Sequence, residues 1–169
     1  RILDAGCGRG RNLVYLANEG FDLHAVDADA ANVEAVRAAL PVLEASRVRH
    51  ASVGSLPFED DTFDVVISNA VLHFAPDHEH FDAMVADMAR VLAPGGMLFA
   101  RLASDIGIED RVQPLGGGRV ALPDGSERYV VDEARLLDWT ARMGGRLLDP
   151  IKTTNVQGLR CMTTWVVGV

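Results

Sequence analysis

Three features are scarce in this sequence, and each absence excludes a class of protein. Only 16 Lys and Arg stand against 24 Asp and Glu, which gives a formal net charge of −8. Nucleic acids and anionic membranes attract cationic surfaces, so we expect neither as a partner. The two cysteines, Cys7 and Cys161, match no zinc or disulfide spacing, which favours free thiols in a cytoplasmic protein. No apolar run is long enough to span a bilayer, and no secretory signal is visible.

The sequence also lacks an initiator methionine, and it starts inside an apparent strand at residues 2–3. We therefore expect that a segment preceding residue 1 is missing. The 169 residues are enough for one domain with a real core, and they contain no repeat, low-complexity tract or linker. We expect a single domain over residues 1–169.

Strand and helix patterns alternate along most of the chain. The apolar runs predict strands over residues 2–3, 23–26, 47–52, 63–68, 97–102, 146–153 and 160–167. Helical periodicity predicts helices over 11–18, 30–40, 80–92 and 133–143. A further hairpin is expected at residues 119–131, around Pro123-Asp124-Gly125. This alternation predicts an open, doubly wound α/β sheet, mostly parallel, with helices on both faces.

Three glycines alternate in the turn that follows the first strand: Gly6, Gly8 and Gly10. Ligands of open α/β sheets bind at the carboxyl ends of the strands, where this turn lies. Glycine can also be needed there for the shape of the backbone alone. The dinucleotide fingerprint G-x-G-x-x-G does not fit, because Arg11 stands where the third glycine belongs. The nearby carboxylate of Asp4 disfavours a pyrophosphate and suits a ligand with an ammonium group.

Four motifs in order give the chain a family resemblance. LDAGCGRG resembles motif I of the class I S-adenosylmethionine-dependent methyltransferases. AVDAD, LPFEDDTFDVVISNAVLHF and RVLAPGGMLF follow at the spacing of that family, so the resemblance covers residues 1–102. Within the family, the chain is most similar to the small tellurite-resistance-type and methyltransferase-domain-11-like members. The resemblance implies a Rossmann-like sheet of seven strands whose last strand is antiparallel.

The resemblance also implies which residues meet the amino-acid end of the cofactor, S-adenosyl-L-methionine, whose product is S-adenosyl-L-homocysteine. Asp4 and the backbone of the glycine turn, Gly6, Gly8 and Gly10, would contact this end. Asn69 would face the ammonium group of the cofactor.

The nucleoside end of the cofactor is assigned in the same way. Asp27 would accept hydrogen bonds from both ribose hydroxyls, although an aspartate at this place can also be a helix cap. Ala28 would lie against the adenine. Many relatives carry an aspartate that accepts from the adenine amino group, and Ser52 stands at that position here. We therefore expect Ser52 and the backbone near Val53 to hold the adenine more weakly.

His73 is the candidate general base. Methyl transfer is an in-line displacement from an activated donor, so a base is needed only when the acceptor arrives protonated. His73 follows the fourth strand and titrates near neutral pH, but it can also be a structural histidine in a turn. The neighbouring His78 and His80 resemble helix-start residues more than ligands, and we expect no metal.

The acceptor is the least defined part of the prediction. We expect residues 104–131 to form an insertion on the substrate side, where Arg101, Arg119, Arg128 and Tyr129 either clamp an anionic acceptor or are solvated. A small-molecule acceptor is the favoured interpretation, and the oligomeric state is left open. The alternatives are an RNA or protein methyltransferase, an inactive cofactor-binding or regulatory protein of the same fold, and a nicotinamide-dependent reductase.

Overall fold

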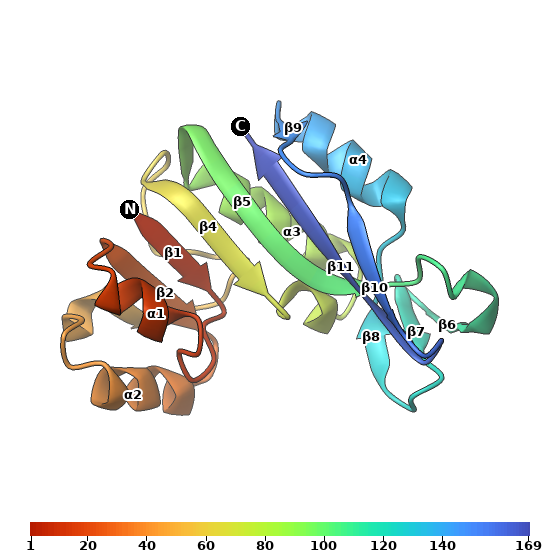
Figure 1. Cartoon of the computed structure of the whole chain (residues 1–169), viewed down its shortest axis with the longest axis horizontal. Helices are drawn as coiled ribbons and strands as arrows, with labels where there is room; N and C mark the ends of the chain where they lie inside the picture. Colours follow the sequence, from red (N-terminus) through yellow and green to blue (C-terminus); the bar gives the residue numbers. More distant parts are fainter.

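A computed structural model describes all residues 1–169 and contains one large mixed sheet with helices on both faces (Figure 1). The strands of this sheet are β1 (Ile2–Ala5), β2 (Leu23–Asp27), β3 (Val48–His50), β4 (Phe63–Asn69), β5 (Leu92–Ser104), β10 (Lys152–Val156) and β11 (Arg160–Gly168). The α-helices are α1 (Leu13–Asn18), α2 (Ala30–Ala39), α3 (His78–Arg90) and α4 (Glu133–Arg142). Short 3-10 turns are η1 (Ala45–Arg47), η2 (Leu72–Phe74) and η3 (Glu109–Arg111). None of the helices has the length and apolar character needed to cross a membrane.

The order of the seven strands is β10-β11-β5-β4-β1-β2-β3. Strands β1 to β5 run parallel to one another, and β11 runs antiparallel to both β5 and β10. A two-residue strand, β9 (Arg146–Leu147), pairs with β11 outside this row. The open, mostly parallel sheet of seven strands with an antiparallel last strand is confirmed.

The central strands are apolar on both faces, as parallel strands covered by helices must be. Leu3 of β1 belongs to a cluster with Phe81 of α3 and Trp139 of α4. The preceding residue, Ile2, belongs to a separate cluster with Val36 of α2 on the opposite face. In Figure 1, α3 lies behind the sheet. The two clusters hold the carboxyl ends of β1, β2 and β4 side by side.

Several boundaries differ from the sequence prediction, among them the start of β5, which lies at Leu92 instead of residue 97. Two of the differences have clear local causes. Helix α3 starts at His78, two residues early, because Asp77 caps it by accepting a hydrogen bond from the His80 amide at 2.9 Å. The single strand expected over 146–153 is divided into β9 and β10. Pro150 stands between them and has no amide hydrogen to donate to the sheet.

The hairpin expected at 119–131 is present, but it carries a third strand. Strands β6 (Gln113–Gly116), β7 (Arg119–Ala121) and β8 (Glu127–Tyr129) form a separate antiparallel sheet. An apolar cluster that includes Ala103 of β5 and Val120 of β7 packs this small sheet against the carboxyl end of β5. The small sheet therefore stands beside the edge where the parallel strands end.

Candidate active site

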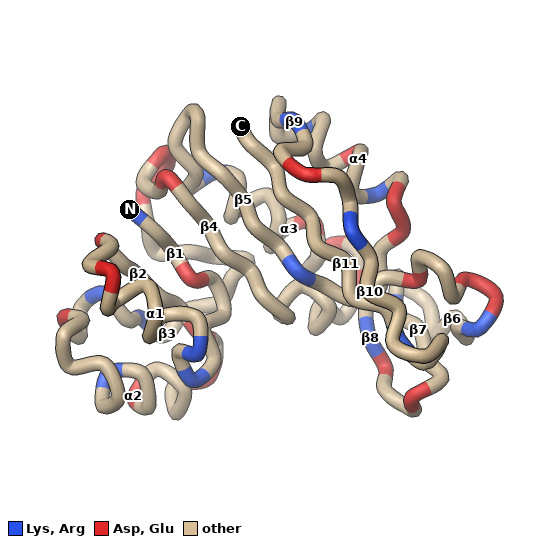
Figure 2. Tube along the Cα trace, in the orientation of Figure 1, with Lys and Arg blue, Asp and Glu red and all other residues tan.

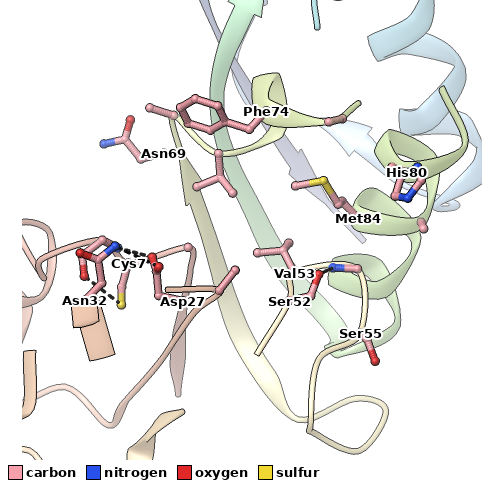
Figure 3. Close-up of a pocket in the computed structure, with 18 of the residues that line it drawn as sticks. Cys7, Asp27, Asn32, Ser52, Val53, Ser55, Asn69, Phe74, His80 and Met84 are labelled. Atoms are coloured by element: carbon pink, nitrogen blue, oxygen red, sulfur yellow. Dashed lines mark hydrogen bonds between the residues drawn. The ribbon is translucent and has the colours of Figure 1, made fainter. Parts of the chain in front are cut away.

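A cavity of about 790 Å³ opens at the carboxyl ends of β1, β2 and β4 (Figure 3). This volume is in the range of pockets that enclose a small molecule or cofactor. Figure 3 shows three parts of the cavity wall. Asp27 and Asn32 lie in one part, Met84 of α3 lies in the part opposite them, and Asn69 and Phe74 lie in the third part. The wall is built by residues from five segments of the chain: 6–12, 27–32, 52–55, 69–76 and 80–84.

The glycines of the turn after β1 serve different purposes. Gly6 has φ +87°, and a Cβ added there would lie 2.4 Å from Cγ2 of Val71, so this glycine lets two loops approach each other. Gly8 has φ +53° with nothing within 4 Å of such a Cβ, and it faces the open cavity. Gly10 is buried beneath α2 and does not line the cavity. Backbone shape therefore accounts for Gly6, whereas contact with a ligand stays a prediction for Gly8, which lies at the cavity wall.

Asp27 connects the glycine turn to the end of β2. One carboxylate oxygen accepts from the Gly8 amide at 2.7 Å. The other accepts from the Asp29 amide at 2.9 Å and from Nδ2 of Asn32 at 3.0 Å. The side chain nevertheless reaches the cavity wall. Sequence reasoning missed Asn32, whose only signal was an amide residue near the start of the helix that follows Asp27.

A buried polar chain runs from β1 to β4. Asp4 is fully buried, and one of its oxygens accepts from Nδ2 of Asn12 at 3.4 Å. Oδ1 of Asn12 in turn accepts from Nδ2 of Asn69 at 3.4 Å. Oδ1 of Asp4 and Oδ1 of Asn69 have no hydrogen-bond partner. Asn12 and Asn69 line the cavity, whereas Asp4 lies behind them.

Two unpartnered buried acceptors make this region suited to a cationic donor, because buried oxygens without a donor are costly. Burial is also the main reason why the pKa of Asp4 rises to about 7, with a smaller contribution from the charge of Asp27. Asp4 is the residue that the sequence assigned to an ammonium group.

Comparison with known proteins identifies the family of the chain. A family model described as a methyltransferase domain matches residues 3–100. The chain belongs to the class I S-adenosylmethionine-dependent methyltransferases. The match includes the glycine turn, Asp27 and the segment from Ser52 to Asn69.

Individual relatives agree with this family. The chain is 33% identical to 27-O-demethylrifamycin SV methyltransferase from Amycolatopsis mediterranei over 135 residues, which cover 72% of the chain and 48% of the relative. The chain thus spans about half the length of that relative. A crystal structure of a S-adenosylmethionine-dependent methyltransferase from Methanosarcina mazei superposes with a TM-score of 0.81 at 19% identity, covering 99% of this chain and 91% of the other.

A second solved structure carries ligands. The 1,6-didemethyltoxoflavin-N1-methyltransferase of Burkholderia thailandensis, with bound S-adenosylhomocysteine, gives a TM-score of 0.75 at 18% identity and covers 99% of this chain and 69% of that one. At this identity the likeness concerns the fold alone.

Ala28, Ser52 and Val53, which the sequence assigns to the nucleoside of the cofactor, all line the large cavity. The carbonyl of Ala28 lies 2.9 Å from Nε2 of His50, which ties the end of β2 to the end of β3. The Ser52 hydroxyl accepts from the Gly54 amide at 3.2 Å, so its acceptor capacity is partly used within its own turn. The weaker adenine contact that the sequence predicts for Ser52 stays a prediction.

An arginine of α3 holds residues 56–60, which follow Ser52 and Val53 in the same loop. Arg90 donates to the carboxylates of Asp87 at 2.7 Å and Asp60 at 2.8 Å. It also donates to the carbonyls of Phe58 at 2.8 Å and Leu56 at 3.1 Å. Except for the contact with Asp87, each of these contacts joins residues about 30 positions apart in the chain. Sequence reasoning did not identify them.

His73 of η2 lies outside the wall of the large cavity. It lines a neighbouring cavity of about 230 Å³ instead. Burial, followed by the charges of Arg128 and Arg101, lowers the pKa of His73 to about 4. The imidazole is therefore neutral at pH 7, and its role as a base stays a prediction.

The other polar candidates near the cavity have partners within the protein. Nδ1 of His78 lies 2.9 Å from the Tyr129 hydroxyl, and Nδ1 of His80 lies 2.7 Å from the cap residue Asp77. Cys7 and Cys161 are free, as expected. Burial raises the pKa of the Cys7 thiol to about 12, so this cysteine of the glycine turn stays protonated.

Proposed function

We propose that this domain binds S-adenosyl-L-methionine in the large cavity and supports methyl transfer to a small-molecule acceptor. The observation that carries the proposal is the placement of Asp27 and of the unpartnered oxygen of Asn69 at the wall of one cavity, with the unpartnered oxygen of Asp4 buried behind that wall. Asp27 supplies an acceptor for ribose hydroxyls, and the other two supply acceptors for an ammonium group. A ligand with both groups matches this set, whereas a pyrophosphate would face carboxylates.

Different residues would bind different parts of the cofactor. Asp27 would hold the ribose, while Ala28, Ser52 and Val53 would hold the adenine. Gly8 leaves open space for close approach of the methionine end, because no atom lies within 4 Å of the place of a Cβ. Gly6 and Gly10 would support the turn from behind.

When bound, the cofactor supplies an already activated methyl group. The chain is then left to orient the acceptor and to exclude water. The neutral imidazole of His73 can accept a proton at pH 7, although the low pKa of its conjugate acid makes it a weak base. Alignment by the cavity walls is therefore the main contribution that we propose for this chain.

A small-molecule acceptor is supported by charge and by similar proteins. The formal net charge of −8 disfavours RNA as an acceptor. Two of the similar proteins are named for small molecules, 27-O-demethylrifamycin SV and 1,6-didemethyltoxoflavin. We propose that the insertion at residues 104–131, which includes β6, β7 and β8, forms the wall on the acceptor side.

Thermal unfolding with two ligands tests the proposal against a nicotinamide-dependent activity. S-adenosylhomocysteine at a hundred times its Kd should raise the free energy of unfolding by about 2.7 kcal/mol. For a domain of this size, the corresponding rise in Tm is roughly 5–10 °C. NADH at the same concentration should leave the Tm unchanged. Protection by NADH and none by S-adenosylhomocysteine would refute the methyltransferase proposal.

The raised pKa of Asp4 predicts how cofactor binding depends on pH. The free protein protonates Asp4 below about pH 7, and a bound ammonium group would lower that pKa. Binding therefore releases a proton below pH 7, and affinity should fall by up to about tenfold for each pH unit below that value. Calorimetric titration with S-adenosylhomocysteine between pH 5.5 and 7.5 measures this slope.

Asp4→Asn is the matched control for the pH experiment. The amide keeps the shape of the side chain and does not titrate, so the affinity of this variant should be lower at pH 7.5 and nearly constant with pH. An unchanged slope in Asp4→Asn would assign the pH dependence to another group, and a flat profile in the wild-type protein would contradict an ammonium group beside Asp4.

A further inference from the structure

The second cavity, of about 230 Å³, adjoins the large cavity at Ala70, which lines both. Its wall combines the carboxyl end of β5, the small sheet and the start of β11, and it includes Arg101, Arg128, Arg160 and His73. Figure 2 shows Lys or Arg positions near the end of β5 and on β8, at this side of the molecule. Three arginines around so small a space are unusual in a chain with an excess of acidic residues.

Only one of these arginines is neutralised within the protein. Arg160 pairs with the carboxylate of Asp124 at 3.7 Å, and Ser126 also donates to that carboxylate at 2.6 Å. Arg101 forms no ion pair and no side-chain hydrogen bond. Arg128 donates to the Glu127 carbonyl at 2.7 Å and stacks over the ring of Phe74 at 5.3 Å, without a carboxylate partner. Asp124 also lines this cavity, but Arg101 and Arg128, which are both half-buried, form no ion pair of their own.

The position of Arg101 relates this charge to the cofactor site. Arg101 is the register partner of Asn69 in the parallel pair of β4 and β5. The next residue, Ala70, has the left-handed φ of +64°, and its amide donates to the Arg101 carbonyl at 2.7 Å. A left-handed backbone is uncommon for alanine, and such residues cluster at functional sites. An anion bound by Arg101 would therefore lie beside the Asn69 end of the large cavity.

Phe74, Arg128 and His73 lie between the two cavities or line the small one. Phe74 lines the large cavity on one side, while Arg128 covers its ring from the side of the small cavity. His73 shares the small cavity, and the charges of Arg128 and Arg101 both lower its pKa. The guanidinium groups of Arg101 and Arg128 therefore both influence groups in the small cavity.

We propose that Arg101 and Arg128 bind an anionic group of the methyl acceptor, either a carboxylate or a phosphate. Guanidinium groups suit this role because they donate pairs of hydrogen bonds to planar carboxylates and to phosphates. The inference rests on the proposed function and specifies its substrate class. The anion is held in the small cavity, and the remainder of the acceptor extends past Ala70 toward the cofactor.

Anion binding tests the proposal without knowledge of the acceptor. The wild-type protein, saturated with S-adenosylhomocysteine, is titrated with inorganic phosphate and separately with sodium acetate, at constant ionic strength kept with sodium chloride. Binding is followed by NMR chemical shifts. Arg101→Gln and Arg128→Gln should each weaken the binding of at least one of these anions by about tenfold or more. Preference for phosphate or acetate identifies which anionic group the cavity takes.

Arg146→Gln is the matched control. Arg146 is an exposed arginine of β9 that forms no ion pair, and it pairs with Gly168 near the opposite end of the sheet from Arg101. The same loss of one charge at this site should leave anion binding unchanged. If Arg101→Gln does not fold, Arg128→Gln and the charge-conserving Arg101→Lys provide the same comparison.

Two outcomes separate this inference from the proposed function. If S-adenosylhomocysteine binds while neither anion binds, or while the three glutamine variants bind anions alike, the anionic subsite is refuted and the methyltransferase proposal stands. If S-adenosylhomocysteine does not bind, the proposed function fails, and the assignment of the cavity to a methyl acceptor fails with it.

Discussion

Asp27→Ala is expected to weaken the binding of S-adenosylhomocysteine by at least about a hundredfold. The substitution removes the proposed ribose acceptor, and it leaves the Gly8 amide, the Asp29 amide and Asn32 without their common partner. Hydrogen bonds to a charged group contribute about 1.5–3 kcal/mol each, so the loss of two ribose contacts alone corresponds to this factor or more. Isothermal titration calorimetry of the variant measures the change.

Asp29→Ala is the control for this experiment. Asp29 lies two residues further on and caps α2 by accepting from the Ala31 amide at 2.9 Å, but it does not line the cavity. Its loss should cost about 1 kcal/mol of stability and leave the affinity within about threefold. Asp27→Asn keeps the shape of the side chain and removes its charge, so it separates the effects of charge and shape on affinity at this position. Wild-type affinity in a folded Asp27→Ala protein would exclude Asp27 as the ribose acceptor.

Gly6→Ala is expected to lower the free energy of unfolding by roughly 2–5 kcal/mol. The left-handed φ of +87° costs about 1–2 kcal/mol for a residue with a Cβ. That Cβ would also lie 2.4 Å from Cγ2 of Val71, and overpacking of this kind adds about 1–3 kcal/mol. Urea denaturation of the purified variant measures the total.

Gly8→Ala has the same backbone requirement without the steric conflict. Its φ is +53°, and nothing lies within 4 Å of an added Cβ, so its stability should fall by only about 1–2 kcal/mol. The extra methyl group would instead enter the cavity and weaken S-adenosylhomocysteine binding. In the double variant Gly6→Ala, Val71→Ala, part of the stability should return. Equal losses in the two glycine variants would contradict this division of roles.

The fold, and the meeting of the glycine turn with Asp27 at one cavity, could be predicted because their signals are local. The alternation of apolar runs with helical periodicity gave the parallel sheet, and motif spacing placed the glycine turn and Asp27 at neighbouring strand ends. Asn12 and Asn32 escaped because their partners, Asp4 and Asp27, meet them only after the turn has folded. The spacing of residues along the chain does not indicate such contacts.

Other features escaped because their sequences carry no periodicity or no orientation. All four residues of β6 are exposed, so this strand shows no alternation of apolar and polar positions. The sequence placed His73 after the fourth strand but gave no sign of the cavity that it lines. The 3-10 turn η2 brings it to the wall of the second cavity. The unpaired state of Arg101 could be seen only when every neighbouring carboxylate had been placed.

The most direct test of the central claim is a crystal structure of the protein with S-adenosylhomocysteine. The account predicts the ligand in the cavity of about 790 Å³, with its ribose hydroxyls on the Asp27 carboxylate and its ammonium nitrogen within hydrogen-bond distance of Oδ1 of Asp4 or Asn69. A ligand bound elsewhere, or one in this cavity with its ammonium group turned away from both oxygens, would contradict it.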